Sequence, residues 1–200
     1  MQPFTKLTAI AAPYYFPDID TDKIIPHVFL RKPLSAGYRN FLFYNQRFTP
    51  DGKIKSFVLH DAPYDKAGIL VSGANFGCGS TREGAVYALA DFGFRAIIAP
   101  SFGDIFQSNC LQNGLLPVVL PADMVEQLAT HIEQHPGAVV SIDLQEQMVT
   151  TPDGRSHKFA IDEARKEQLL KGLDDIGITL TDGKLIDEFE KSYKSRYSWL

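Results

Sequence analysis

Cysteine is scarce in this sequence of 200 residues, which contains two in all. Cys78 and Cys110 form no CxxC pair, so we expect neither a disulfide framework nor a metal site made by this chain. No apolar run approaches the roughly 20 residues that a membrane-spanning helix needs. The N-terminal segment lacks the basic start and unbroken apolar stretch of a secretory signal peptide. These absences predict a cytoplasmic protein.

An excess of positive charge is also missing, since 20 Lys and Arg residues face 24 Asp and Glu residues. Nucleic-acid surfaces use clustered Lys and Arg to bind phosphates, so the net charge of −4 argues against such a partner. Repeats, low-complexity tracts and Gly/Ser linkers are absent as well. We therefore expect one domain over residues 1–200, with a helical extension at its C-terminal end.

Hydrophobic periodicity predicts alternating strands and helices in the middle of the chain. Strands are expected at 56–60, 68–72, 95–99 and 115–120, and helices at 81–92, 103–112 and 122–134. Three short strands separated by turns are expected within 138–144, 147–151 and 157–161, before helices at 162–171 and 184–192. This order predicts an α/β fold with a parallel sheet beside a smaller antiparallel layer, in a three-layer β/β/α arrangement.

The stretch "GANFGCGSTREGAVYAL", residues 73–89, joins a glycine-rich loop to an expected helix. Its glycines allow positive φ and close approach of a ligand. One interpretation is purely structural. Ser80 or Thr81 would cap the helix, and Glu83 would complete an S-x-x-E capping box with Ser80.

A functional interpretation of the same stretch starts from Arg82. An arginine in the first helical turn opposes the helix macrodipole, unless a bound carboxylate makes its placement favourable. Backbone N–H groups and the guanidinium would then converge on one anion, and Ser80 could move a proton on the neighbouring carbon. The G-x-S-x-G and Walker motifs are absent, and Cys78 is expected to be a packing residue rather than a nucleophile. The pattern therefore predicts chemistry on a small organic acid.

Several dispersed motifs resemble the small subunits of the isopropylmalate dehydratases in the aconitase superfamily. They are "DIDTDKIIP" at 18–26, "NFGCGSTRE", "IAPSFGDIF", "NGLLPV" and "GLDDIGITL" at 172–180. The resemblance implies a swivelling β/β/α domain like the aconitase C-terminal domain. It also implies a hydro-lyase subunit that interconverts 2- and 3-isopropylmalate in leucine biosynthesis and is active only with a large subunit.

The resemblance further implies a heterodimer in which each subunit contributes different parts of the active site. This chain would bind no cofactor, and the large subunit would hold a [4Fe–4S] cluster on three cysteines. Ser80 matches the serine that abstracts the substrate proton, and Arg82 matches the arginine that grips a substrate carboxylate. Thr81 and Asp22 are expected to contribute to substrate binding. For Asp22, the alternative interpretation is a turn residue that starts a loop.

The sequence departs from the family pattern at two places. Gly84 stands where a histidine is typical, and Ser35 stands where an arginine usually contacts substrate. Arg31, Lys32 or Arg39 could replace that arginine, although each also fits a solvated surface charge.

These departures leave other functions open. Dimethylmalate or citramalate/citraconate is an alternative substrate within the same chemistry. A non-catalytic swivel-domain protein that binds a small acid, or regulates a partner, is an alternative of another class. Retention of both Ser80 and Arg82 argues against that last alternative.

Overall fold

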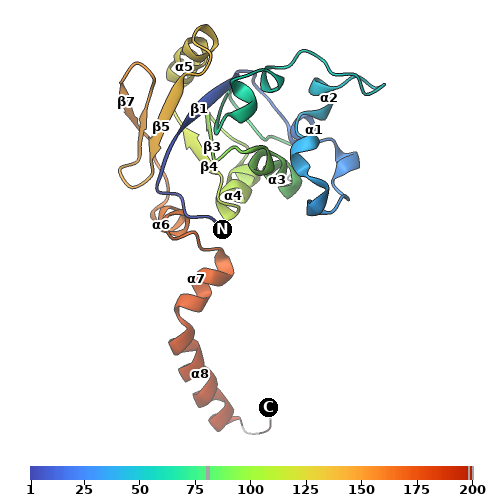
Figure 1. Ribbon diagram of the computed structural model, residues 1–200. Coiled ribbons are helices and arrows are strands. Elements are labelled where there is room, and N and C mark those ends of the chain that lie inside the picture. The colour runs from blue at the N-terminus through green and yellow to red at the C-terminus, as the bar shows by residue number, and fades with distance from the viewer. Residues whose placement is uncertain (80–81, 198, 200) are drawn as a thin grey trace.

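In the part of the chain that the computed structural model describes, residues 1–79, 82–197 and 199, seven strands form one sheet (Figure 1). The strand order is β4-β3-β2-β1-β5-β6-β7. The bounds are β1 Lys6–Tyr14, β2 Ile69–Ser72, β3 Ala96–Ala99, β4 Leu116–Val119, β5 Val139–Asp143, β6 Met148–Thr150 and β7 Ser156–Lys158. Strands β1 to β4 are parallel, whereas β5 to β7 continue the sheet antiparallel. The predicted α/β class, with its parallel and antiparallel parts, is confirmed.

Strand β1 joins the two parts, and the sequence analysis missed it. Its residues 6–10 pair antiparallel with β5, and its residues 11–14 pair parallel with β2. Alanines and Pro13 make up much of its buried half, and both residue types are depleted in strands. Burial between neighbours on both sides, rather than local propensity, therefore makes this segment a strand.

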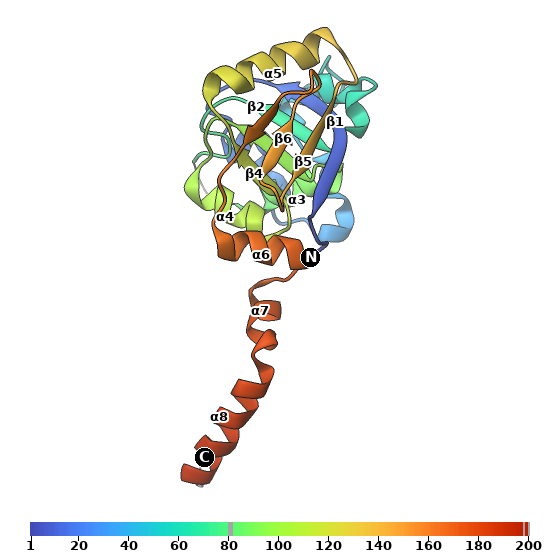
Figure 2. The ribbon, with the colours of Figure 1, turned by 90° about the vertical axis from the view of Figure 1, so that its left-hand side faces the viewer.

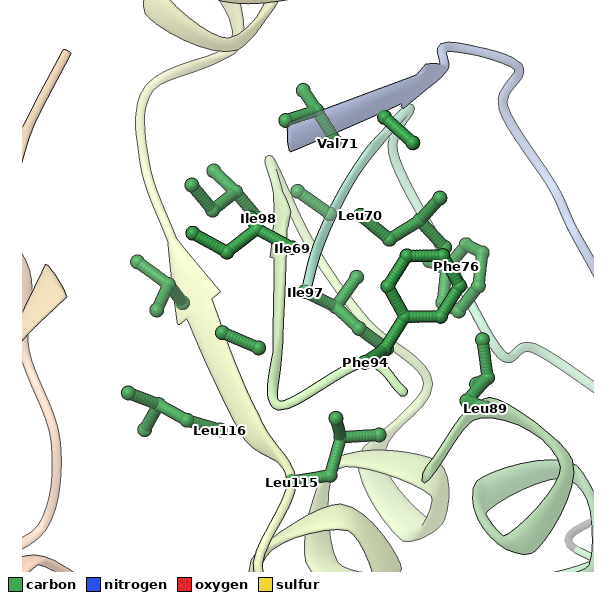
Figure 3. Packing of buried hydrophobic residues seen from close by; sticks show 14 of the residues in the cluster. Ile69, Leu70, Val71, Phe76, Leu89, Phe94, Ile97, Ile98, Leu115 and Leu116 are labelled. Carbon is green, nitrogen blue, oxygen red and sulfur yellow. The ribbon is translucent and has the colours of Figure 1, made fainter. Parts of the chain in front are cut away.

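Helices cover both faces of the parallel strands. Helices α3 (Glu83–Phe92) and α4 (Asp104–Gln112) lie on one side, while α5 (Ala122–Gln134) and the antiparallel strands lie on the other (Figures 1 and 2). Every residue of β2 and β3 is buried. Figure 3 shows Phe76 and Leu89 packed beside Phe94 on the α3 side of this core. The predicted helix at 122–134 is confirmed to the residue.

The expected strand at 56–60 is wrong, because Val58–His60 form a 3-10 turn. Both neighbours of β1 are already in place, so a strand here would find no free edge beside it. Phe57 and Leu59 are nevertheless buried, so the alternating pattern indicated burial correctly and the backbone conformation incorrectly. Two further short helices, α1 (Thr21–Ile24) and α2 (Tyr44–Arg47), belong to the same irregular first third.

The C-terminal helices leave the body of the molecule. Helix α6 (Glu163–Lys171) packs on it, α7 (Asp175–Thr181) follows, and α8 (Gly183–Arg196) projects away with no buried residue (Figure 2). The sequence analysis expected part of α8 but not α7. A single domain over residues 1–200 stays a prediction. No helix among the described residues is long and apolar enough to cross a membrane.

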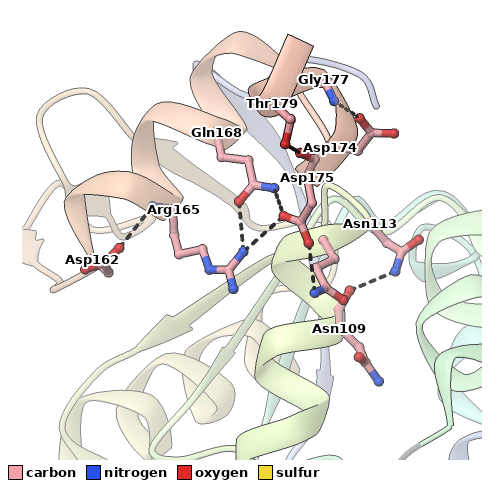
Figure 4. Close-up of polar contacts among 10 residues, drawn as sticks. Asn109, Asn113, Asp162, Arg165, Gln168, Asp174, Asp175, Gly177 and Thr179 are labelled. Carbon is pink, nitrogen blue, oxygen red and sulfur yellow. Dashed lines mark hydrogen bonds and ion pairs between the residues drawn. The ribbon is translucent and has the colours of Figure 1, made fainter. Parts of the chain in front are cut away.

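A polar cluster fixes the start of α7 (Figure 4). The Asp175 carboxylate accepts hydrogen bonds from Gln168 Nε2 at 3.0 Å and from Gln112 Nε2 at 3.4 Å, and it pairs with Arg165 at 3.6 Å. Asp174 caps the helix by accepting from Gly177 N at 2.6 Å. These contacts link α7 to α4 and α6, so α7 leaves the body in a defined direction.

Candidate active site

Two of the predicted site residues meet at the start of α3. The Arg82 guanidinium donates through Nη1 to Asp22 Oδ1, although 60 residues separate them along the chain. The Arg82 side chain is 25% exposed and that of Asp22 is 53% exposed, so both are open to a ligand. The other two predicted residues, Ser80 and Thr81, lie outside the described residues. They immediately precede Arg82 in the sequence.

Three of the motifs named above come together around this pair. Gly77 N donates to Ile19 O at 2.7 Å, and Thr21 N donates to Cys78 O at 3.2 Å. On the other side of the loop, Gly103 N donates to Phe76 O at 2.9 Å. The loop at 73–79 therefore runs between the segment that carries Asp22 and the turn that precedes α4.

The start of α3 differs from the predicted capping box. Arg82 is the N-cap, with an extended backbone (φ −125, ψ 115), and Glu83 is the first helical residue rather than the third. No side chain among the described residues caps the helix, and the Glu83 carboxylate instead accepts from Asn113 Nδ2 at 3.3 Å. The extended backbone carries the Arg82 side chain off the helix end toward Asp22. A guanidinium beside the N–H groups of a helix start forms a site suited to a carboxylate.

Gly77 is the glycine that this loop most needs. Its φ is +73, and a Cβ there would lie 2.1 Å from Cγ of Phe106 in α4. We expect Gly77→Ala to destabilise the protein by about 2–5 kcal/mol, from the left-handed backbone and the clash together. Urea unfolding measures the change in free energy.

The matched control for that substitution is Gly154→Ala. Gly154 has a similar φ of +85, but a Cβ there would meet no atom within 4 Å. This variant measures the effect of backbone conformation alone, so the difference between the two variants measures the contact with Phe106. Equal destabilisation of both variants would contradict the packing argument.

Neither cysteine is suited to act as a nucleophile. Burial, together with the Asp20 and Asp18 carboxylates, raises the pKa of the Cys78 thiol. Complete burial raises the pKa of Cys110 well above its ordinary value. A cysteine nucleophile must be the thiolate, which both shifts disfavour. Among the described residues, no group of three or more His, Cys, Asp or Glu side chains could hold a metal ion.

The two departures from the family pattern have structural correlates. At Gly84, in the first turn of α3, a Cβ would lie 2.6 Å from Cδ2 of Leu30, so a larger residue would require the Leu30 side chain to move. Arg39 stacks over the Phe92 ring at 5.9 Å, at the far end of α3 from Arg82. A helix of ten residues is about 15 Å long, so Arg39 is poorly placed to replace the missing arginine. Arg31 and Lys32 remain as candidates.

Sequence reasoning missed three polar residues that organise the loop. Asp20 caps α1 by accepting from Lys23 N at 2.7 Å. Asp18 accepts from Asn75 Nδ2 at 2.7 Å, which joins the first motif to the loop. For Asp18 and Asp20 the signal was the Asp-x-Asp-x-Asp spacing of residues 18–22, of which the sequence analysis singled out Asp22 alone.

Comparison with known proteins finds relatives that match the whole length of the chain. The model of the aconitase C-terminal domain matches residues 1–123, and a second model, LeuD_N, matches residues 126–163. The chain is 48% identical to the 3-isopropylmalate dehydratase small subunit of Paramagnetospirillum magneticum, with 100% of both chains covered. It is 50% identical to that of Phenylobacterium zucineum, with 100% of this chain and 98% of the other covered.

A solved structure shows the same fold. The crystal structure of 3-isopropylmalate dehydratase from Methanocaldococcus jannaschii is 28% identical and superposes with a TM-score of 0.65. The superposition covers 92% of this chain and 99% of that one.

Proposed function

The chain belongs to the family of 3-isopropylmalate dehydratase small subunits, and we infer from this that it is the small subunit of a hydro-lyase in leucine biosynthesis. The reaction interconverts 2- and 3-isopropylmalate by loss and readdition of water. The observation that carries the assignment is identity of 46–50% to curated small subunits over the full chain. A small subunit also implies a large partner subunit.

We propose that Arg82 and Ser80 are the catalytic residues of this chain. The Arg82 guanidinium binds one substrate carboxylate, with the N–H groups at the start of α3 and with Thr81 and Asp22 beside it. The deprotonated Ser80 hydroxyl takes the proton from the substrate carbon as hydroxide leaves the neighbouring carbon. Readdition returns the proton and hydroxide to exchanged positions. The positive charge of Arg82, two residues away, favours the alkoxide that this role needs.

The leaving hydroxide needs a partner that this chain does not provide. An iron–sulfur cluster is held by three or four cysteine thiolates, whereas this chain has two cysteines. We propose that the large subunit carries a [4Fe–4S] cluster, which would act as the Lewis acid toward the substrate hydroxyl. We further propose a heterodimer that works in the cytoplasm.

The second substrate carboxylate needs a cation, because Ser35 replaces the arginine expected there. Arg31 and Lys32 make no hydrogen bond or ion pair through their side chains with the described part of the chain, so their charges are available. Tyr38 Oη donates to Lys32 O at 2.9 Å and so holds the backbone of this segment. We propose that one of these two side chains contacts the second carboxylate.

The function is tested by reconstitution. We expect no turnover of isopropylmalate by this chain alone or by the large subunit alone, and turnover by the mixture. The double variant Arg31→Ala/Lys32→Ala should raise KM for isopropylmalate. Turnover by the lone chain, or preference of the mixture for dimethylmalate or citramalate, would contradict the assignment.

A further inference from the structure

Two strained residues touch each other beside the candidate site. Asp18 has φ 52 and Asn75 has φ 60, and they are two of the four non-glycine residues with positive φ in the described part of the chain. Asn and Asp adopt this left-handed region more readily than other non-glycine residues. Strained backbone that persists is held by its surroundings, and it gathers at functional sites.

Hydrogen bonds at these two residues join three segments of the chain, which lie around residues 18, 75 and 101. Asn75 Nδ2 donates to Asp18 Oδ1 at 2.7 Å, and Asp18 N donates to Ala74 O at 2.9 Å. The backbone N–H of Asn75 donates to Ser101 Oγ at 2.8 Å. Both side chains are exposed, so burial does not account for their arrangement. We call the side-chain pair Asp18 and Asn75 the loop clamp.

The loop clamp lies where the two active-site segments begin to run together. Asp22 follows Asp18 by four residues, and Arg82 follows Asn75 by seven. Beyond the clamp, the backbone bonds from Gly77 to Ile19 and from Thr21 to Cys78 hold the same two segments together. A shift at the clamp would therefore change where Arg82 stands relative to Asp22.

We propose that Asp18 and Asn75 are positioning residues, which fix the relative register of the Asp22 and Arg82 segments before substrate binds. The proposal rests on the proposed function, in which Arg82 holds a substrate carboxylate. Misplacement of a catalytic group by about 1 Å can lower a rate by about 100-fold. The hydrogen bond between Asp18 and Asn75 would therefore affect the rate through the position of Arg82, although neither residue touches substrate.

The decisive variant is Asn75→Gly in the reconstituted enzyme. Glycine keeps the left-handed backbone without strain and removes only the side-chain bond. We expect kcat/KM for isopropylmalate to fall about 10- to 100-fold, with unchanged binding of the large subunit and little change in Tm. Asp18→Asn keeps an acceptor oxygen for Asn75 and should stay within about threefold of the wild type. Asp18→Gly, which likewise keeps the left-handed backbone and removes only the side-chain bond, should behave like Asn75→Gly.

The double variant and a distant pair complete the test. Asp18→Gly/Asn75→Gly should be no worse than either single variant, because both substitutions remove one shared bond. Ser141→Ala, which breaks an exposed 2.7 Å bond with Thr8 between β5 and β1, should leave kcat/KM unchanged.

Wild-type kcat/KM in Asn75→Gly would overturn the proposal, as would a lowered Tm without a lowered kcat/KM. Additive losses in the double variant would overturn it as well. Arg82→Lys in the same assay separates this from failure of the proposed function. Full activity of Arg82→Lys would refute the role of Arg82, whereas its loss alongside a normal Asn75→Gly would refute the loop clamp alone.

Discussion

Ser80→Ala is expected to lower kcat of the reconstituted enzyme by about 10² to 10⁴, the usual loss when a general base is removed. The reason is specific to the proposed chemistry, in which the Ser80 oxygen takes the proton from the substrate carbon. Binding of isopropylmalate depends mainly on Arg82, so KM should change far less. Steady-state kinetics with saturating large subunit measures both constants.

Thermal unfolding of the same variant tests the competing interpretation of Ser80 as a helix cap. Loss of an N-cap lowers stability by about 1 kcal/mol. Because Arg82 is the N-cap of α3, we expect Tm to stay close to that of the wild type. Ser192→Ala in the projecting helix α8 is the matched serine control and should change neither kcat nor Tm. A normal kcat with a lowered Tm would show that Ser80 only supports the fold.

Arg82→Lys is expected to lower kcat/KM by about 10- to 150-fold, although the charge is retained. Arginine offers a planar fork of donors that grips a carboxylate through two parallel bonds, whereas the lysine ammonium is a point charge on a flexible stem. Loss of one hydrogen bond to a charged group weakens binding by about 1.5–3 kcal/mol, which corresponds to that range. The contact with Asp22 would also be reshaped, which adds to the misplacement. We expect KM to rise together with a fall in kcat.

Arg39→Lys is the matched control for that experiment. Arg39 sits over Phe92 at the other end of α3, so its replacement should leave kcat/KM within about twofold of the wild type. Equal losses of kcat/KM in the two variants would mean that the substitutions act by disturbing helix α3, and not through a contact of Arg82 with substrate. Wild-type kinetics in Arg82→Lys would exclude a bidentate carboxylate contact.

The parts of the fold that could be predicted are those whose local pattern matches their environment. Helix α5 has a strong apolar stripe bounded by Pro121 and His135, so its limits were visible in the sequence. Strands β2 to β4 are short apolar runs buried on both faces, which is typical of parallel sheets. Strand β1 was missed because its burial depends on β2 and β5, which lie far away in the sequence. The turn at 58–60 was misjudged for the same reason, since both edges of the neighbouring strand β1 are occupied by β2 and β5.

The site residues also divide into those that the sequence indicated and those that only the structure shows. Spacing within one stretch singled out Ser80 and Arg82, since both fall where the sequence pattern changes from a glycine-rich loop to a helix. The resemblance pointed to Asp22, and the structure places that residue against Arg82. No local pattern could show that Asp18 reaches Asn75 across 57 residues, because the bond depends on the left-handed backbone at both positions.

The position of β1 at the centre of the sheet has a consequence for synthesis of the chain. This strand leaves the ribosome first, but β2 begins 55 residues after Tyr14 and β5 begins 125 residues after it. At about 5–20 residues per second, the edge that awaits β5 stays unpaired for about 6 to 25 seconds. An unpaired strand edge is a template for wrong pairing. Residues 6–10, which are the half that must wait, begin with Lys6 and carry Thr8, whereas the more apolar half from Ala11 onward is covered earlier by β2.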